Sequence, residues 1–250
     1  MAAKKKSRIR LDDLLIERGL AKDRAHAVAL LLAGEVCVTG HESPKAGTLV
    51  PTDVELKHSS PQPFVSRAGT KLSHALDHFK VEVAGRVCAD VGAATGGFSD
   101  VLLKRGAKKV FAIDVGYGDL AWSVRSDPRL VPIERTNARY LDALPEPPDL
   151  IVVDVSFISL ALIIPSIRRW IDRRPADLLL LIKPQFEAAP DEVGSGGVVA
   201  DPAVHTRVIE EVRQALFHSE FIDRGVIDSP IRGMTGNKEF LVYATTKLPS

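Results

Sequence analysis

A glycine-rich loop next to acidic residues is the first feature of the sequence that could do chemistry. The apolar run 87–91 contains Asp90 and continues into Gly92-Ala93-Ala94-Thr95-Gly96-Gly97-Phe98. Glycines between a strand and a helix let the backbone approach a ligand closely, and open α/β sheets bind ligands at the carboxyl ends of their strands. Asp114 ends the next apolar run, twenty-four residues after Asp90. A carboxylate at that place can accept hydrogen bonds from ribose hydroxyls.

The spacing of the loop distinguishes between two cofactors. A dinucleotide-binding loop spaces its glycines as G-x-G-x-x-G, which this loop does not match, and Asp90 would repel a pyrophosphate. S-adenosylmethionine carries a positive sulfonium and no phosphate, so the loop predicts this cofactor. The alternatives are a turn that binds no ligand and, for Asn137, an ordinary turn residue in place of a contact with the adenine edge. The expected cofactor contacts are Asp90, Gly92, Ala93, Thr95, Gly96, Gly97, Phe98, Asp114 and Asn137.

Four further polar residues interrupt apolar runs or lie at their edges. Asp154 follows the run 150–153, Lys183 follows the run 178–182, Glu239 precedes the run 240–243, and Lys71 lies on a predicted helix before the first strand. A charged side chain at the carboxyl end of a buried parallel strand faces the ligand crevice. The alternative for each residue is a charge that marks where a strand meets solvent.

Methyl transfer to a hydroxyl is the chemistry that these residues could serve. The sulfonium already makes the methyl group electrophilic, so the enzyme must supply alignment and a base. A lysine is a poor base at its reference pKa of about 10.4, and a nearby cation or burial lowers that value. We expect Lys71 to be the cation beside Lys183, with Asp154 and Glu239 orienting the two ammonium groups.

A parallel sheet would bring these positions to one edge. Apolar strand-like runs alternate with helix-length segments after residue 66, which predicts an α/β domain whose sheet is covered by helices on both faces. A helix is expected over 69–79. Strands are expected near 87–91, 109–115, 150–155, 178–182 and 240–245, with one more near Val226.

Residues 1–58 predict a separate, small α+β module. Leucines at helical spacing from Leu11 to Leu15 precede Gly19, and a second helix is expected over 23–33, with Asp23 as its cap and Gly34 as its stop. Strands are expected at 36–38 and 54–56, with a turn over 39–41. The proline-bearing stretch 59–65 predicts a linker to the domain over 66–250.

Composition excludes several classes of protein. The 250 residues include 33 basic and 32 acidic side chains and are 45% hydrophobic, which excludes wholesale disorder and a polybasic protein. No apolar run approaches the roughly 18 residues that cross a bilayer, and the basic start at 4–6 lacks the apolar region of a signal peptide, so we expect a cytoplasmic protein. Cys37 and Cys88 have no zinc-site spacing, so we expect two reduced core thiols and no metal.

The motifs resemble two known families. The segments Leu11-Asp-Asp-Leu-Leu-Ile-Glu-Arg-Gly-Leu20 and Ala33-Gly-Glu-Val-Cys-Val-Thr-Gly40 are similar to the S-four-type RNA-binding domain. The rest of the chain resembles the TlyA family of rRNA 2′-O-methyltransferases, whose catalytic domain is of the FtsJ type. The motifs that carry this resemblance are Ser66–Leu72, Asp90–Phe98, Asp114–Gly118, Glu134–Arg139, Asp154–Ser159, Lys183–Glu187 and Gly236–Phe240.

The resemblance implies a fold, a reaction and a catalytic tetrad. The fold is a Rossmann-like class I methyltransferase sheet, and the reaction is methylation of cytidine 2′-hydroxyls in ribosomal RNA. The tetrad falls on Lys71, Asp154, Lys183 and Glu239. The chain ends at Ser250 without the C-terminal extension of the longer family type, which favours a large-subunit target, whereas the basic residues 4–6 depart from the shorter type.

Ribosomal RNA or a ribosomal subunit is therefore the expected partner. The first 60 residues hold ten basic and eight acidic side chains, a balance of +2 that would not by itself indicate an RNA-binding protein. A solvated helix face explains several of these charges equally well, and a helix-start salt bridge explains Arg67 equally well. The expected RNA contacts are Arg8, Arg10, Arg18, Lys22, Arg24 and Arg67.

Two other functions remain to be weighed. Many relatives carry the name haemolysin, but a membrane-active toxin needs a spanning segment or a strong amphipathic stripe, and neither is evident; leakage of liposomes would reveal one. An RNA-binding protein without activity is disfavoured because all four tetrad positions and the glycine loop are present. The sequence indicates neither the target nucleotide nor the oligomeric state.

Overall fold

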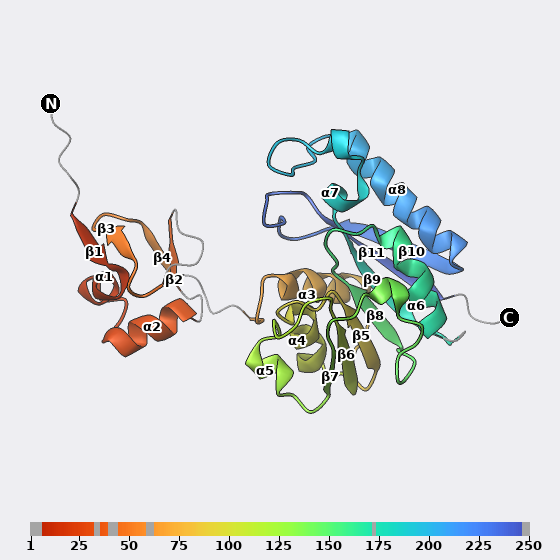
Figure 1. The fold of residues 1–250 in the computed structure, drawn as a ribbon, viewed down its shortest axis with the longest axis horizontal. Helices are drawn as coiled ribbons and strands as arrows, with labels where there is room; N and C mark the ends of the chain where they lie inside the picture. The colour runs from red at the N-terminus through yellow and green to blue at the C-terminus, as the bar shows by residue number, and fades with distance from the viewer. Residues whose placement is uncertain (1–6, 33–35, 40–44, 59–62, 172–173, 247–250) are drawn as a thin grey trace. The chain divides into compact units, whose positions relative to one another are not determined.

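The computed structural model describes residues 7–32, 36–39, 45–58, 63–171 and 174–246. The chain divides into two units, Met1–Pro63 and Phe64–Ser250 (Figure 1). The division falls within the stretch 59–65 that the sequence predicts as a linker, of which residues 59–62 lie outside the described part. Each unit has its own buried apolar cluster, so each is described by itself.

The first unit packs two helices against short strands. Helix α1 (Leu11–Glu17) ends before Gly19, which has a φ of +72°, and α2 (Arg24–Leu32) is capped by Asp23, whose Oδ1 accepts a hydrogen bond from the His26 amide at 2.7 Å. Both predicted helices are confirmed. The predicted helix stop at Gly34 and the turn at 40–41 lie outside the described residues. Strand β1 (Arg8–Arg10) pairs antiparallel with β3 (Leu49–Pro51), and β2 (Val36–Val38) with β4 (Leu56–His58).

Two of these four strands were not expected. The predicted strand at 54–56 begins two residues before β4, and neither β1 nor β3 has an apolar pattern long enough to signal a strand. Three-residue strands depend on their pairing partner for stability rather than on their own propensity.

The second unit is built on a seven-stranded sheet with the order β10-β11-β9-β8-β5-β6-β7. The strands β5 to β9 run parallel. The chain begins at β5, moves outward to β7 and returns to β8 on the other side of β5, so the strand order reverses between β5 and β8. The strands are β5 (Val87–Val91), β6 (Lys109–Ile113), β7 (Leu130–Ile133), β8 (Leu150–Val153), β9 (Asp177–Ile182), β10 (Phe221–Asp228) and β11 (Phe240–Thr246).

The last two strands correct the expectation of a purely parallel sheet. β11 runs antiparallel to both β9 and β10 and lies between them. The segment 229–239 that joins β10 to β11 is short, and a short connection makes an antiparallel pair because parallel strands need a crossover of a dozen or more residues. β7, an edge strand that contains Pro132, was also not predicted.

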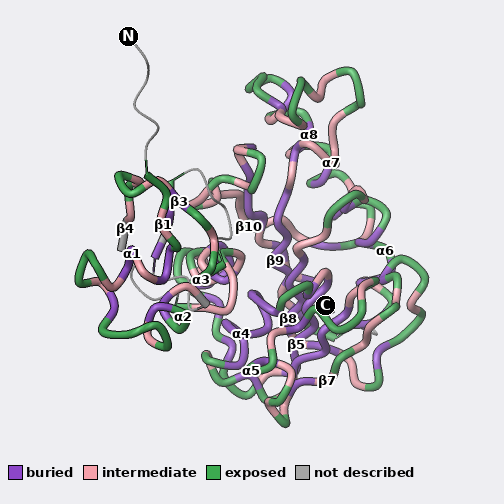
Figure 2. Tube along the Cα trace, turned by 60° about the vertical axis from the view of Figure 1, so that its left-hand side comes forward, coloured by how far each residue is buried: buried purple, intermediate pink, exposed green. Residues whose placement is uncertain are grey.

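Helices cover both faces of the sheet, which confirms the predicted Rossmann-like fold. Helices α3 (Ala68–Phe79) and α4 (Gly97–Lys104) belong to one apolar cluster, and α6 (Ile164–Trp170) and α8 (Pro202–His218) belong to the other. Successive residues of the central strands enter the two clusters alternately, and Figure 2 shows these strands as buried. The remaining helical segments are α5 (Trp122–Arg125), α7 (Pro184–Glu187), and the 3-10 turns η1 (Ala138–Tyr140), η2 (Leu160–Leu162) and η3 (Pro190–Glu192).

The register brings the polar residues to one edge of the sheet. The Asp154 amide donates to the Val91 carbonyl at 2.9 Å, which extends the β5–β8 pairing by one residue. Phe240 lies opposite Ile182 in the antiparallel β9–β11 pair. Glu239, just before β11, therefore lies at the same edge as Lys183, just after β9.

Candidate active site

The four charged residues of the predicted tetrad form two ion pairs. Lys71 on α3 donates from Nζ to Glu239 Oε2 at 2.5 Å, and the two residues are 8% and 3% exposed. The Lys183 Nζ lies 2.7 Å from Asp154 Oδ1 and donates to Ser156 Oγ at 3.0 Å. Asp154 and Glu239, the two acids expected to orient the lysines, each pair with a different lysine: Glu239 with Lys71 and Asp154 with Lys183. Ser156, a partner of Lys183, was not expected.

The local sequence explains why Lys71 is buried. Its neighbours on α3, Gly69, Leu72 and Ala75, face the core, and a buried ammonium requires a charged partner. The loop before β11 closes over that partner, because a Cβ added at Gly233 would collide with Glu239 Oε1. The Lys71–Glu239 pair is therefore enclosed by a helix on one side and a loop on the other.

The glycine loop makes close contacts within the protein itself. Gly92 has a φ of +85°, and a Cβ added there would collide with the backbone carbonyl oxygen of Asp154. At Gly97 an added Cβ would collide with Ser66 Oγ. These two glycines are required by packing against other segments of the chain, in addition to any room that a ligand needs. The contact at Gly92 joins the loop directly to Asp154.

Asp90 is a buried acid with one free oxygen. It is fully buried; its Oδ2 accepts a hydrogen bond from Ser99 Oγ at 2.7 Å, and among the described residues its Oδ1 has no hydrogen-bond partner. Burial raises the pKa of Asp90 to about 7, and the nearby charges of Asp154 and Asp114 add to this effect. Ser99, which was not expected, opposes the shift by stabilising the ionised form.

Asp114 and Glu134 hold the loops that follow β5 and β6. Asp114 accepts from the Ala94 amide at 2.8 Å and from the Gly116 amide at 2.7 Å. Glu134 accepts hydrogen bonds from the two terminal guanidinium nitrogens of Arg125, at 2.7 and 2.9 Å, and from the Gly118 amide at 2.8 Å. The Arg125 hydrogen bonds hold the pKa of Glu134 below its usual value. No role was predicted for Glu134.

Asn137 has the role of a turn residue in this structure. Its side-chain oxygen caps η1 by accepting from the Arg139 amide at 3.0 Å. Asn137 is exposed, and its contact with an adenine edge stays a prediction.

The predicted RNA contacts differ in how much of their charge is available. Arg10 makes a two-pronged hydrogen bond to Asp12, at 3.0 and 2.6 Å, and Arg24 pairs with Asp13 at 2.7 Å. Arg18 donates to the Thr52 carbonyl at 2.7 Å. The residues Arg8 and Lys22 are exposed.

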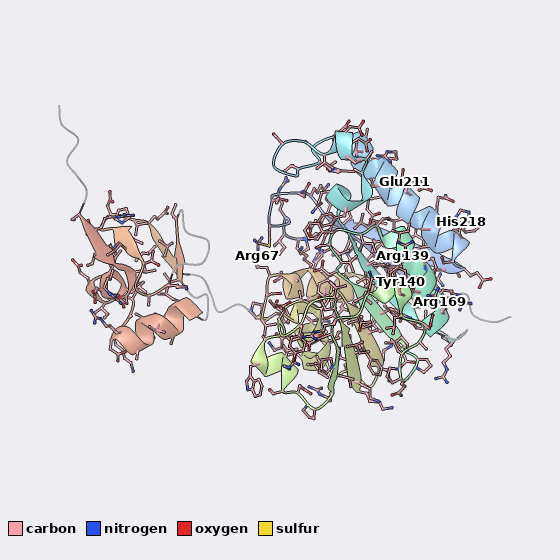
Figure 3. The ribbon with its side chains drawn as sticks, in the orientation of Figure 1. Arg67, Arg139, Tyr140, Arg169, Glu211 and His218 are labelled. Carbon is pink, nitrogen blue, oxygen red and sulfur yellow. The ribbon has the colours of Figure 1, made fainter. Side chains whose placement is uncertain are left out.

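Arg67 lies at the start of α3 (Figure 3) and donates to the Arg232 carbonyl at 3.3 Å. It makes no ion pair with any residue that the structure describes, so the alternative of a helix-start salt bridge is not observed.

The glycine-bearing segment 187–199 is tied at its end to the loop before β11. Asn237 is fully buried; its Oδ1 accepts from the Val199 amide at 2.9 Å, and its Nδ2 donates to the Gly197 carbonyl at 2.7 Å. Asn237 stands two residues before Glu239, so it links this segment to the tetrad. Asn237 belongs to the motif Gly236–Phe240 that carries the family resemblance, but no role was predicted for it.

Comparisons with known proteins identify the family. The model of the FtsJ-like methyltransferase family matches residues 64–246. The chain belongs to this family. It is 45% identical over 244 residues to the 16S/23S rRNA (cytidine-2′-O)-methyltransferase TlyA of Mycobacterium tuberculosis, covering 96% of this chain and 91% of that protein. The resemblance to TlyA proteins that the motifs predicted is confirmed.

Two further similarities bear the haemolysin name. The chain is 38% identical over 240 residues to Hemolysin A of Brachyspira hyodysenteriae, and the alignment covers 94% of this chain and 99% of that protein. A solved structure of a candidate hemolysin from Streptococcus thermophilus has 37% identity and a TM-score of 0.73, covering 97% of this chain and 90% of that one. Within the described residues of this methyltransferase, no helix has both the length and the apolar character that crossing a membrane requires.

The residues at the sheet edge fit the cofactor of a methyltransferase. The unpartnered Oδ1 of Asp90 and the carboxylate of Asp114 are acceptors, and each suits a ligand with positive groups and ribose hydroxyls. Asp90, Asp114 and Asp154 together would repel a phosphate. S-adenosylmethionine, which has positive groups and no phosphate, matches this set of acidic acceptors, whereas a dinucleotide does not.

The contact at Gly92 makes the first prediction. Gly92→Ala should destabilise the methyltransferase more than Gly85→Ala, because both positions have a positive φ but only at Gly92 does the new Cβ meet backbone. The strain shared by both should be about 1–2 kcal/mol, and overpacking at Gly92 should add roughly 1–3 kcal/mol. Chemical unfolding of the two variants measures the difference. Equal losses of stability would show that the contact with Asp154 relaxes freely.

The buried acid makes the second prediction. Because the folded-state pKa of Asp90 is about 7 and the usual value is 3.8, its contribution to stability is fully present below about pH 4 and is lost as the pH rises to about 7. The stability of the wild type relative to Asp90→Asn should therefore fall across this window, by at most about 1.4 kcal/mol per pH unit. Urea unfolding at a series of pH values measures this.

Ser99→Ala serves as the matched variant for Asp90. It removes the hydrogen bond that favours the ionised carboxylate, so the window should extend to higher pH. A difference between the wild type and Asp90→Asn that stays constant from pH 5 to pH 8 would contradict the assignment.

Proposed function

We propose that this protein transfers a methyl group from S-adenosylmethionine to the ribose 2′-hydroxyl of cytidine in ribosomal RNA. The observation that carries the proposal is the Lys183–Asp154 ion pair of 2.7 Å, next to a glycine loop that packs on the Asp154 backbone. The candidate base Lys183 contacts Asp154, and the backbone of Asp154 in turn contacts the candidate cofactor loop at Gly92. The relatives named as cytidine-2′-O-methyltransferases support the choice of acceptor.

The residues divide into two groups by their proposed roles. Bound at the glycine loop, S-adenosylmethionine supplies a methyl group that its sulfonium makes electrophilic. Lys183, once its ammonium group has released a proton to solvent, takes the proton of the 2′-hydroxyl as the oxygen attacks, and Asp154 and Ser156 fix the position of the lysine nitrogen. The Lys71–Glu239 pair is buried, and the role of Lys71 as the cation beside Lys183 stays a prediction. General base catalysis of this kind contributes typically about 10²–10⁴-fold to a rate.

The first unit is the proposed RNA-binding domain. Its exposed Arg8 and Lys22 are available for phosphates, and Arg10, Arg18 and Arg24 can exchange their present partners for phosphates. Arg67, at the start of α3, extends these contacts onto the catalytic unit. The site of action is then the cytoplasm, where ribosomal RNA is assembled into subunits. The expected large-subunit target stays a prediction, and mapping of ribose methylation on both ribosomal RNAs, with and without the protein, tests it.

The proposed base makes the third prediction. Lys183→Ala should lower the rate of RNA methylation by at least about 100-fold while S-adenosylmethionine still binds, because the lysine acts at the acceptor hydroxyl. Lys109→Ala is the control, since Lys109 lies at the opposite edge of the sheet and pairs with Glu146. Methyl transfer to RNA and calorimetry with the cofactor provide the two measurements. Turnover by Lys183→Ala within a few-fold of the wild type would refute the assignment of the base.

The division into two units makes the fourth prediction. A protein truncated to begin at Phe64 should still bind S-adenosylmethionine, because every proposed cofactor contact lies beyond that residue. It should lose most of its methylation of ribosomal RNA, since the 2′-hydroxyl is aligned only when the RNA is docked. RNA binding by the full-length protein should weaken more steeply with salt, by about 0.7–0.9 in log–log slope for each phosphate contact that truncation removes.

The comparison requires that the truncated protein is folded, which circular dichroism checks. A folded truncated protein that methylates RNA as efficiently as the full chain would show that the first unit is not the recognition domain.

A further inference from the structure

Two segments that follow neighbouring strands meet at several points beside the tetrad. The post-β8 segment (154–160) carries Asp154, and the post-β9 segment (183–187) carries Lys183. At one end they are joined by the Lys183–Asp154 ion pair and the Lys183–Ser156 hydrogen bond, at 2.7 and 3.0 Å. Midway, the rings of Phe157 and Phe186 have centroids 5.0 Å apart. The other end is closed by Glu187, to which the tetrad assigns no role.

The Glu187 carboxylate uses both oxygens to bind the post-β8 segment. Its Oε2 accepts from Ser159 Oγ at 2.6 Å, and its Oε1 accepts from the Leu160 amide at 2.9 Å. Leu160 is buried in the core, and Ser159 caps η2 by accepting from the Ala161 amide at 3.2 Å. Glu187 therefore fixes the point at which the post-β8 segment enters the core.

Glu187 and Lys183 stand at the two ends of one helical turn. Lys183 is the N-terminal cap of α7 (Pro184–Glu187), and the Phe186 amide donates to the Lys183 carbonyl at 2.9 Å. A short turn that begins with proline has little freedom to bend. Lys183 and Glu187 therefore belong to one short backbone element.

Glu187 is partly buried, and its carboxylate is held by two hydrogen bonds. Desolvation raises the pKa of Glu187, whereas the hydrogen bonds from Ser159 and Leu160 oppose that rise. On α8, Glu211 adds to the rise, and Glu211 is itself paired with Arg207 at 2.6 Å. An acid in this position is unfavourable unless its donors stay in place, so the carboxylate and the post-β8 segment hold each other.

We infer that Glu187 is a positioning residue, which ties the post-β8 segment to the post-β9 segment and so holds the Lys183 amine against Asp154. The inference rests on the proposed function for its effect on methyl transfer, but the tie itself is a property of the two segments. Glu187 does not touch the reacting atoms; it acts through Lys183.

Glu187→Gln is the most direct test of the tie. The amide keeps the size of the side chain but offers one acceptor and one donor group, so it can serve only one of the two donors. We expect kcat for RNA methylation to fall by about tenfold or more, as a small misplacement of reacting groups does. The KM and the calorimetric affinity for S-adenosylmethionine should stay within about twofold of the wild type, because no expected cofactor contact is altered.

Two further variants are compared with Glu187→Gln: one removes its hydrogen-bond partner, and the other is a control. Ser159→Ala removes the same hydrogen bond from the other side, and its effect on kcat should not add to that of Glu187→Gln, as is usual for residues in contact. It also keeps the test open if Glu187→Gln folds poorly. Glu210→Gln is the matched control, because its side chain is 55% exposed and pairs with Arg213 on α8; its kcat should equal that of the wild type.

Chemical labelling of amines, read by mass spectrometry, tests the tie without relying on activity. In the wild type the Lys183 side chain is 12% exposed and ion-paired, so it should label slowly. Glu187→Gln and Ser159→Ala should both label faster at Lys183, with no change at Lys71, whose partner lies elsewhere. Slower or unchanged labelling at Lys183 would overturn the inference, as would an unchanged kcat.

Faster labelling at both lysines, together with weaker cofactor binding, would show general loosening of the fold and would also overturn the inference. If the wild type itself fails to methylate RNA, the proposed function fails, and the labelling still decides whether Glu187 ties the segments.

Discussion

The close packing of Gly92 against the Asp154 backbone is the constraint on which the rest of the site depends. The chain reverses its direction across the sheet between β5 and β8, and these two strands carry the glycine loop and Asp154 at their carboxyl ends. A side chain at position 92 would separate them, because a Cβ there collides with the Asp154 carbonyl oxygen. A reversal of strand order is where open α/β sheets form a ligand crevice. Gly92 lets the two segments that border this place, the glycine loop and the chain at Asp154, remain in direct contact.

The charges at this edge are arranged so that no lysine of the tetrad is buried alone. Each one is paired with a carboxylate, at 2.5 Å for Lys71 and 2.7 Å for Lys183, because removing one partner of a buried pair leaves an uncompensated charge that costs several kcal/mol, roughly 3–5. Asp90 is different, since its hydrogen-bond partners among the described residues are the hydroxyl and the backbone amide of Ser99, which carry no charge, and its pKa rises to about 7. That a cationic ligand pairs with this acid stays a prediction.

Residues outside the sheet strands hold several loops near the site in place. Glu187 and Asn237 each bind two groups from segments 27–40 residues away in the sequence, and Glu134 binds Arg125 and the Gly118 amide, 9 and 16 residues away. They lie next to the predicted chemistry without taking part in it. Such residues decide how well strand-end side chains are aligned, since the ends of strands are held only on one side by the sheet. The first unit shows a related pattern, in which Asp12 and Asp13 partner two of the arginines proposed to bind RNA.

The sequence alone determined the positions of the main strands and the fold, and it placed the four charged residues of the predicted tetrad at or near strand ends. Buried strands such as Val87–Val91 and Leu150–Val153 are continuous apolar runs, and a charge that directly follows such a run is visible without any structure. Short strands such as β1, β3 and β7 were missed because their stability comes from pairing, which a local pattern does not contain.

Only the tertiary structure decided which charges meet. Lys71 and Glu239 are 168 residues apart, and their contact requires α3 to pack on a sheet whose last strand is inserted antiparallel between β9 and β10. No role was predicted for Ser99, Ser156 or Glu187, because the partner of a hydrogen bond depends on the direction in which the local chain holds the side chain and not on the type of residue. Residue types and apolar runs thus fix which groups lie at the sheet edge, and the packing of helices and loops on that edge fixes which of them touch.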